Sequence, residues 1–450
     1  MSVQRPAVTP PAPYVFPTAQ RSTLPNGLGV HAYDLPGQYV ISVRLHLPLS
    51  LAAEPRELEG IATVMARLLD EGTARHSSEE FAELLERRGI ALGAGMSDRG
   101  LAVDLDVPRR HLDAALDLLR QALAEPAFPD AEVARIVRSR LAQIEQERAI
   151  PGPRAARELA ATFFDPAERA SRPTAGRAES VAAITPQALR DFHARHLGPV
   201  GGAVVVAGDL GGLDLDAMLG ETLGAWTGGP QAVPTQETAP PREAGHRHRI
   251  VLVDRPGAVQ SELQVACPGP DRRVAGGWAP YPVLGYVIGG SPTARIDQVL
   301  REERGFTYGL RSGFRPRAAG GLFVTSGSVR ADATAEALGL VLDILDGARE
   351  GFTEEELRAG VDFVTRAAPA RYATADTVAD EAISAAMDGL PDDFPTTVLA
   401  QMSRLGAEDL RTAYASYVQG DWTVVLVADA AVYADAVREL GRGEVAVVPA

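Results

Sequence analysis

Hydrophobic and polar positions alternate over several short stretches of this chain. Residues 39–49 (YVISVRLHLPL) and 102–107 (AVDLDV) carry an apolar side chain at nearly every second position. Successive side chains of a β-strand point to opposite faces of its sheet. The alternation therefore predicts strands that bury one face.

Other stretches repeat their apolar residues every three to four positions, which is the spacing of one face of a helix. Residues 77–89 begin with two serines that can cap a helix, and they end at Gly89, which can terminate it. Residues 109–126 form a second such stretch, and 331–350 and 353–367 repeat the pattern late in the chain. Because both halves combine strands and helices, we expect an α+β fold of mixed β-sheets with helices packed on one face.

The chain contains the same order of motifs twice. One apolar stretch ends at Asp34 and a similar one at Asp254, while two further stretches end at Asp209 and Asp429. Both pairs are separated by 220 positions. Matching order and spacing at several places predicts two duplicated halves.

The duplication divides the chain into four parts. We predict a flexible N-terminal extension at residues 1–20, a first half at 21–226, a linker at 227–246 and a second half at 247–450. The linker is rich in Pro, Gly, Thr and Glu and lacks large apolar side chains, which is typical of a segment outside any core.

Composition and charge narrow the class of protein. Hydrophobic residues make up 46% of the 450 residues and charged residues 23%, as in globular proteins. No apolar run approaches the ~18 residues of a membrane span, and the N-terminus lacks the apolar core of a signal peptide. The net charge of −15 argues against a nucleic-acid partner. We therefore expect a cytoplasmic protein that binds neither nucleic acid nor membrane.

Cysteine and histidine offer little metal chemistry. Cys267, the single cysteine, lies in an apolar stretch, where a buried small side chain is expected. His193 and His196 have a metal-ligand spacing. The duplicated helix has Tyr414 and Tyr417 at those positions, which favours a packing role for the two histidines.

Residues 60–73 (GIATVMARLLDEGT) resemble the first helix of the insulinase/pitrilysin family of zinc metallopeptidases. In that family the helix has the form G-x-A-H-x-x-E-H-x-x-x-x-G-T, in which the histidines bind zinc and the glutamate is the general base. The resemblance places Thr63, Ala66 and Arg67 at those three positions. A methyl group cannot act as a base, and a guanidinium puts a permanent cation where the metal would sit.

The third zinc ligand of the family is a glutamate on a later helix. The matching stretch here is 133–152, where the position falls nearest Gln143, with Glu145 as the alternative. Because a catalytic zinc needs three protein ligands, one carboxylate would not restore the site. The resemblance therefore implies that this chain binds no metal cofactor and carries no catalytic residue of its own.

The second half retains a different motif of the family. Residues 285–314 are similar to L-G-G-x-x-x-S-R-L-x-x-x-L-R-E-x-x-G-x-x-Y, and the match includes Arg301 and Tyr308. In the family, this arginine and tyrosine reach across the chamber between the halves and bind the substrate backbone. A guanidinium can hold peptide carbonyls, and a phenol can donate to a developing oxyanion. Arg295, in the same motif, is expected to be structural.

The combination of a lost zinc motif and a retained Arg–Tyr pair is similar to one subunit of the two-chain members of this family. It implies a heterodimer in which a homologous subunit carries H-x-x-E-H and the zinc, with a peptide substrate held between the subunits. Processing of peptides, leaders or precursors would fit this arrangement. A second hypothesis is a purely structural or peptide-binding homologue without a hydrolytic role, similar to the core subunits of respiratory complexes.

Overall fold

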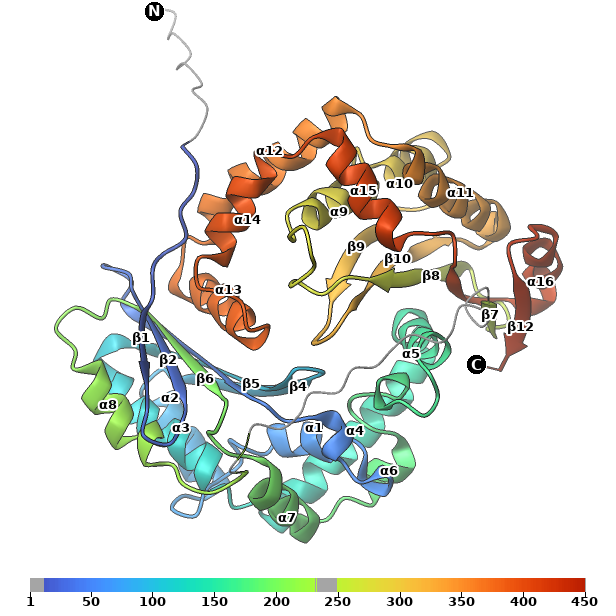
Figure 1. The fold of residues 1–450 in the computed structure, drawn as a ribbon. Coiled ribbons are helices and arrows are strands. Elements are labelled where there is room, and N and C mark those ends of the chain that lie inside the picture. Colours follow the sequence, from blue (N-terminus) through green and yellow to red (C-terminus); the bar gives the residue numbers. More distant parts are fainter. Residues whose placement is uncertain (1–11, 231, 233–248, 450) are drawn as a thin grey trace, which may run out of the picture.

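The computed structural model describes residues 12–230, 232 and 249–449. It contains two six-stranded mixed sheets with helices, one sheet from each half of the chain, as Figure 1 shows. The predicted α+β class and the duplicated halves are confirmed. Most of the predicted linker and residues 1–11 lie outside the described residues.

The first sheet has the strand order β1-β2-β6-β3-β5-β4. Only β2 and β6 among these neighbours are parallel. The two stretches predicted as strands form β3 and β5, which pair in register from Val40↔Pro108 to Leu47↔Leu101. The strands of this sheet are β1 (Gln20–Thr23), β2 (Gly29–Asp34), β3 (Val40–Leu47), β4 (Ala91–Ser97), β5 (Gly100–Pro108) and β6 (Ala203–Gly208).

The second sheet has the order β12-β7-β11-β8-β10-β9. Apart from β1 and β12, it repeats the first sheet strand for strand, with β7, β8, β9, β10 and β11 in the places of β2, β3, β4, β5 and β6. Its strands are β7 (Arg249–Asp254), β8 (Gln260–Gly269), β9 (Arg311–Pro316), β10 (Gly321–Arg330), β11 (Thr423–Ala428) and β12 (Glu444–Val448).

The repeated aspartates make the same contact in both halves. Asp209 accepts a hydrogen bond from the backbone N–H of Gly37 at 2.9 Å, and Asp429 accepts one from Gly257 at 2.7 Å. Both glycines have a left-handed backbone, with φ of 86° and 72°. A residue with a side chain rarely adopts this conformation, so each turn requires its glycine. The aspartate then accepts the N–H of that glycine in both halves.

Helices pack on one face of each sheet and build a core for each half. The expected helix at 77–89 forms α2, whose N-terminus has a capping box between Ser77 and Glu80. The helices of the first half are α1 (Ile61–Ala66), α2 (Ser78–Glu86), α3 (Leu112–Ala124), α4 (Asp130–Ala149), α5 (Pro151–Phe163), α6 (Ala178–Ala182), α7 (Pro186–His196) and α8 (Leu215–Glu221).

The second half repeats this order of helices. Its first long helix, α9, follows β8 as α1 follows β3, and α12 corresponds to α4 in the same way. The helices are α9 (Pro280–Gly289), α10 (Arg295–Asp297), α11 (Thr334–Gly347), α12 (Glu354–Arg371), α13 (Ala375–Met387), α14 (Phe394–Met402), α15 (Ala407–Tyr417) and α16 (Ala430–Glu439). A π-helical turn, η7 (Gln298–Glu303), continues α10.

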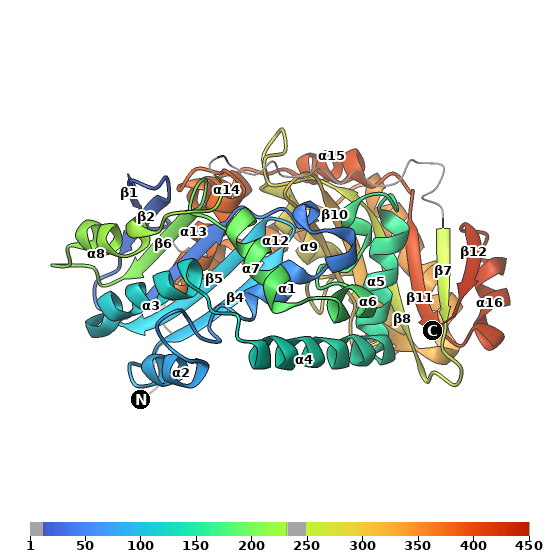
Figure 2. The ribbon, with the colours of Figure 1, turned by 90° about the horizontal axis from the view of Figure 1, so that it is seen from below.

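Each sheet is covered on its second face by a helix from the opposite half, a feature that the sequence pattern did not predict. Helix α5 packs on β8 and β11 (Figure 2). Its Leu159 and Phe163 belong to one apolar cluster with Val425. Helix α13 packs on β3 and β6, and its Asp380 accepts a hydrogen bond from Nε of Arg44 at 2.6 Å. This reciprocal exchange of helices fixes the orientation of the two halves.

The described part of the predicted N-terminal extension also bridges the halves. Phe16 is 3% exposed and packs edge-on against Tyr33 and Tyr372. Its backbone N–H donates to Oγ1 of Thr396 on α14 at 2.9 Å. An aromatic ring here removes a large apolar area from water, which anchors this segment. No helix within the described residues is long and apolar enough to cross a membrane.

Candidate functional site

A buried ion pair holds the N-terminus of α1, the helix of the 60–73 motif. Glu54 Oε1 accepts the backbone N–H groups of Gly60 and Ala62, each at 3.1 Å, and Oε2 lies 2.7 Å from Nη2 of Arg169. Burial raises the pKa of the Glu54 carboxyl, while the nearby Arg169 guanidinium opposes that rise. Carboxylate oxygens stabilise the unpaired N–H groups at a helix start, so α1 begins at a defined place.

The first two motif positions on α1 are used in packing. Gly60 has φ of 100°, and a Cβ there would lie only 2.9 Å from the backbone of Ala175. This close approach brings Oγ1 of Thr63 to the carbonyl oxygen of Thr174, to which it donates at 3.3 Å. Ala66 is 2% exposed. Neither position presents a free ligand to a cleft.

The third motif position contacts the later helix directly. Arg67, at the end of α1, donates from Nη1 to Oε1 of Gln143 on α4 at 2.7 Å. Glu145 lies on another face of α4, where its 65% exposed side chain pairs with Arg148. Of the two alternatives left by the sequence, Gln143 is therefore the one that faces α1.

The histidines of α7 are partly buried and pack against aromatic neighbours. His193 donates from Nε2 to the carbonyl oxygen of Leu123 at 2.8 Å and lies edge-on to Phe128. In the second half, the hydroxyl of Tyr414 donates in the same way to the carbonyl oxygen of Leu345. Burial lowers the pKa of His193, because a charged imidazole loses hydration there. The predicted packing role is confirmed for His193.

Arg301 and Tyr308 lie on an exposed loop of the second half. Arg301 belongs to the π-helical turn η7, and Nε lies 3.4 Å from Oε1 of Glu302. Its side chain is 40% exposed. Tyr308 follows in the connection to β9 and is 93% exposed. Its hydroxyl forms no hydrogen bond within the part of the chain that the structure describes.

The backbone around Tyr308 is nevertheless anchored by hydrogen bonds of the neighbouring residues. Asp297, whose side chain is fully buried, accepts the N–H of Leu310 at 2.9 Å and a hydrogen bond from Nη1 of Arg311 at 3.0 Å. On the other side, Oγ1 of Thr307 donates to the carbonyl oxygen of Ser328 at 2.7 Å. These bonds leave the Tyr308 side chain as the outward tip of an anchored loop.

The structure therefore brings together two of the predicted positions and keeps two others apart from them. Arg67 contacts Gln143, whereas no contact in the described residues links Arg301 or Tyr308 to either. Arg295, expected to be structural, forms a two-pronged ion pair with Glu356 at 2.6 and 2.8 Å.

Sequence reasoning missed two buried carboxylates that organise these regions, Asp297 and Glu54. In each case the available signal was an acidic residue close to a conspicuous motif, but a sequence does not reveal which acidic residues are buried.

Comparison with known proteins places these features in a family. The profile of the insulinase peptidases (family M16) matches residues 40–173, and that described as the Peptidase M16 inactive domain matches 183–362. The chain belongs to the insulinase (M16) peptidase family. The first match lies within the first half and includes the 60–73 motif, while the second begins just before α7 of the first half and extends into the second half as far as α12.

Several relatives of this M16 member cover most of its length. An uncharacterized zinc protease of Mycobacterium tuberculosis is 28% identical over 361 residues, which span 78% of this chain and 80% of that protein. A non-peptidase homolog of Helicobacter pylori is 24% identical over 379 residues, 82% of this chain and 84% of that one. The crystal structure of a peptidase M16 inactive domain from Pseudomonas fluorescens superposes with a TM-score of 0.84 at 23% identity, covering 91% and 98% of the two chains. That likeness shows the shared fold.

The residues that the motif resemblance assigns to the family's zinc positions do not fit zinc. A catalytic zinc site needs three nitrogen, oxygen or sulfur ligands with an open fourth position. Here Thr63 is hydrogen-bonded to a backbone carbonyl, Ala66 has no donor atom, and the Arg67 cation is paired with Gln143. No group of three or more His, Cys, Asp or Glu side chains with metal-binding geometry occurs elsewhere among the described residues.

Proposed function

We propose that this chain is the zinc-free subunit of a two-chain M16 peptidase. In this assembly Arg301 and Tyr308 contact the peptide, and a homologous subunit carries the H-x-x-E-H motif and its zinc. The observation that carries the proposal is the loop at Tyr308, where a phenol is 93% exposed on a backbone anchored by the buried Asp297. Fixing the backbone of a surface loop costs conformational entropy, and an exposed phenol on an anchored backbone suits a role toward a ligand outside this chain.

The chemistry of the pair suits peptide binding. A guanidinium has several fixed donors for peptide carbonyl groups, and it stays charged at any physiological pH. A phenol placed near the scissile bond can donate to the oxygen that becomes negative when water attacks. Neither group needs a metal on its own chain, which agrees with the residues found at Thr63, Ala66 and Arg67.

The first sheet offers a surface for an extended substrate. Strand β4 is an edge of this sheet and pairs only with β5 among the described strands. At Gly93 and Gly95, a Cβ would meet nothing within 4 Å, so another backbone can approach closely. An extended peptide can add to such an edge as a further strand. Peptide or precursor processing would use this mode of binding.

A structural homologue without hydrolytic role is the second candidate. The observation that favours it is the Arg67–Gln143 hydrogen bond, which joins α1 and α4 directly where the motif resemblance would place zinc ligands. The Helicobacter pylori relative is described as a non-peptidase homolog. The two candidates differ in one respect that can be measured: only the first needs Arg301 and Tyr308 for hydrolysis.

The test is hydrolysis of a mixture of internally quenched fluorogenic peptides. The chain is assayed alone and mixed with an M16 chain that carries H-x-x-E-H and is encoded in the same genome, and zinc is determined in each sample. We expect activity and zinc only in the mixture. Tyr308→Phe and Arg301→Ala should each reduce kcat/KM about 10- to 100-fold, as for loss of a donor used in the transition state, without preventing assembly.

Arg304→Ala is the matched control, because Arg304 follows the same turn and is half exposed, with an ion pair to Glu336. It should retain full activity. Unchanged activity in both site variants would contradict the assigned roles of Arg301 and Tyr308. An assembled but inactive mixture would favour the structural homologue.

A further inference from the structure

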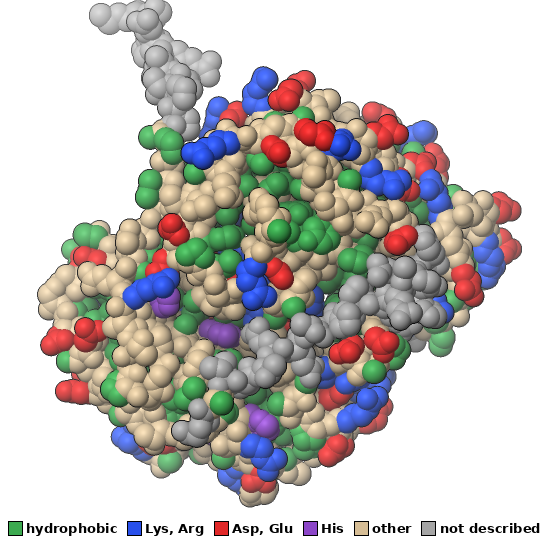
Figure 3. Space-filling view, in the orientation of Figure 1, with side chains coloured by type: hydrophobic (Ala, Val, Ile, Leu, Met, Phe, Trp, Pro, Cys, Tyr) green, Lys and Arg blue, Asp and Glu red, His purple; other side chains and the backbone are tan. Residues whose placement is uncertain are grey.

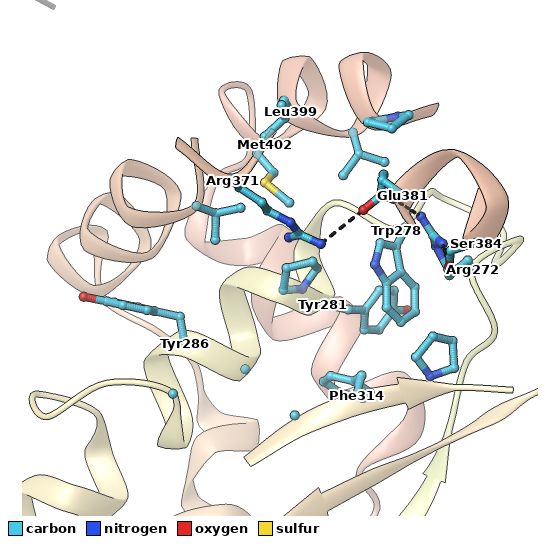
Figure 4. A pocket seen from close by; sticks show the side chains of 18 of the residues that line it. Arg272, Trp278, Tyr281, Tyr286, Phe314, Arg371, Glu381, Ser384, Leu399 and Met402 are labelled. Atoms are coloured by element: carbon cyan, nitrogen blue, oxygen red, sulfur yellow. Dashed lines mark hydrogen bonds and ion pairs between the residues drawn. The ribbon is translucent and has the colours of Figure 1, made fainter. Parts of the chain in front are cut away.

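A cavity of about 690 Å³, the C-terminal cleft, opens mainly in the C-terminal half, with Arg99 of the N-terminal half also in its lining. It lies between α9, α12, α13 and α14 and beside strand β9 (Figure 4). Helices α9 and α12 are the counterparts of α1 and α4. From α9 the cavity is lined by Tyr281, Pro282, Gly285 and Tyr286.

The two counterpart helix pairs differ in how they are packed. On α1, Thr63 and Arg67 are both occupied in hydrogen bonds to neighbouring segments. On α9, Gly285 adds no side chain, and Tyr286 stacks on Phe363 of α12 with ring centroids 4.5 Å apart. The C-terminal cleft therefore remains open, whereas α1 and α4 are in direct contact.

The walls of the C-terminal cleft are mainly aromatic and aliphatic. Trp278, Tyr281 and Phe314 line one side, and Leu399 and Met402 of α14 line the other, as Figure 4 shows. Hydrophobic side chains gather over this half on the face shown in Figure 3. A volume of several hundred Å³ with such walls is typical of a site for a small ligand or a few side chains.

The charged side chains at the cavity are mostly cations, although the chain as a whole has a net charge of −15. Arg99, Arg272, Arg315 and Arg371 line it, with Glu381 as the one lining carboxylate among the described residues. Both oxygens of Glu381 are already bound, Oε1 at 2.7 Å from Nη2 of Arg272 and Oε2 at 3.1 Å from Nη2 of Arg371. An anion is therefore the complementary ligand.

The four guanidinium groups differ in how many of their donors are already used. Asp388 pairs with Arg99 at 2.7 Å and lies 3.5 Å from Arg272, so both of those groups have partners. Arg371 is 64% exposed beside Glu381. Arg315 is exposed, and its guanidinium forms no hydrogen bond or ion pair to any residue that the structure describes. Its donors are therefore available to a ligand.

The strand that carries Arg315 favours a peptide over a compact small molecule. Within the described sheet, β9 is an edge strand that pairs only with β10. Residues from Ser312 to Pro316 line the cavity along this edge. An unpaired edge offers backbone donors and acceptors to an extended chain, while the adjacent pockets receive its side chains.

We propose that the C-terminal cleft binds the carboxyl-terminal residues of a peptide that ends in a large apolar or aromatic residue, with the terminal carboxylate on Arg315. This site requires neither Arg301, Tyr308 nor a second subunit. It can therefore be tested on the chain alone, and it stands or falls separately from the proposed heterodimer.

The test uses fluorescence anisotropy with an amino-terminally labelled peptide of sequence Gly-Gly-Leu-Phe, as the free acid and as the carboxamide. We expect the full-length chain to bind the acid about tenfold more tightly than the amide, as for a charge-assisted contact at a partly exposed site. Arg315→Gln should remove this preference. Arg404→Gln, an exposed arginine at the end of α14 outside the cavity, is the matched control and should retain it.

A second variant tests the apolar walls. Leu399→Trp places a larger side chain in the cavity and should weaken binding of the acid at least about tenfold, with circular dichroism verifying the fold. Equal binding of acid and amide by the unaltered chain would overturn the proposal, as would a preference that persists in Arg315→Gln. Competition by 3-phenylpropionate as effective as the unlabelled peptide would also overturn it, because the cleft would then be a site for small free acids.

Discussion

Arg67 and Gln143 are joined by a hydrogen bond of 2.7 Å between Nη1 and Oε1, across the contact of α1 and α4. The motif resemblance predicts that these residues occupy two positions where members of the M16 family have zinc ligands. In this structure the two positions are in contact and form a cation–amide pair. Because the guanidinium is always charged, this pair also disfavours a divalent cation at the same place.

The Arg67–Gln143 bond should be measurable as a coupling in stability. Arg67→Ala, Gln143→Ala and the double variant form a cycle that isolates the pairwise contribution. We expect a coupling free energy of about 0.5–1.5 kcal/mol, typical of one hydrogen bond, from urea unfolding. A coupling near zero would mean that the pair forms no persistent bond in solution.

Asp297 should determine the order of the loop that carries Tyr308. Asp297→Ala leaves the buried N–H of Leu310 without its acceptor, which costs about 1–3 kcal/mol. Asp297→Asn retains an acceptor oxygen and should cost less. Limited proteolysis with trypsin, read by mass spectrometry, should show faster cleavage after Arg311 in Asp297→Ala than in Asp297→Asn. Equal cleavage rates in the two variants would contradict the anchoring role.

The stability of the first half should depend strongly on the buried ion pair of Glu54 and Arg169. Arg169→Met leaves the Glu54 carboxylate, 0% exposed, without its cation. Removal of one partner from a buried ion pair costs about 3–5 kcal/mol. Thermal unfolding should show the largest loss in Arg169→Met and partial recovery in the double variant with Glu54→Gln, which removes the unpaired charge. If the double variant were the less stable of the two, the loss would come from packing and not from charge.

His193 should make the fold sensitive to mild acid. Burial lowers the pKa of His193, and also that of His46, so the unfolded chain binds these protons more readily than the folded chain. In the unfolded chain the pKa of a histidine is about 6.5. The folded protein therefore keeps its stability above this pH, and its free energy of unfolding decreases as the pH falls below it. His193→Tyr, which introduces the residue that the second half has at Tyr414, should reduce the loss of stability between pH 7 and pH 5.

The control for this prediction is His111→Gln, which removes a partly exposed histidine from the turn before α3. It should leave the difference in unfolding free energy between pH 7 and pH 5 close to that of the unaltered chain. Chemical unfolding at pH 7 and pH 5 provides both measurements. An unchanged difference in His193→Tyr would assign the acid sensitivity to other groups, with His46 the next candidate.

Much of the fold could be predicted because its signals are local. Alternation over 39–49 correctly predicted a strand, and Ser77 with Glu80 specifies the start of α2. The prediction that this strand buries only one face was wrong, because α13 covers the second face of β3 and Ser42, Arg44 and His46 are buried there. The turns at Gly37 and Gly257 require the same glycine–aspartate combination, so the duplication remained visible at 220-residue spacing. Local backbone chemistry of this kind depends on residues a few positions apart, and a single sequence contains it in full.

The sequence by itself determined the α+β class, the duplicated halves and the residue types at the motif positions. Only the tertiary structure decided that α5 and α13 exchange between the halves, that Gln143 and not Glu145 faces Arg67, and that the C-terminal cleft is open. It also revealed that Asp297 and Glu54 are buried. The physical reason is that burial, and contact between segments far apart in the chain, depend on how whole elements pack, and no local pattern of residues specifies that packing.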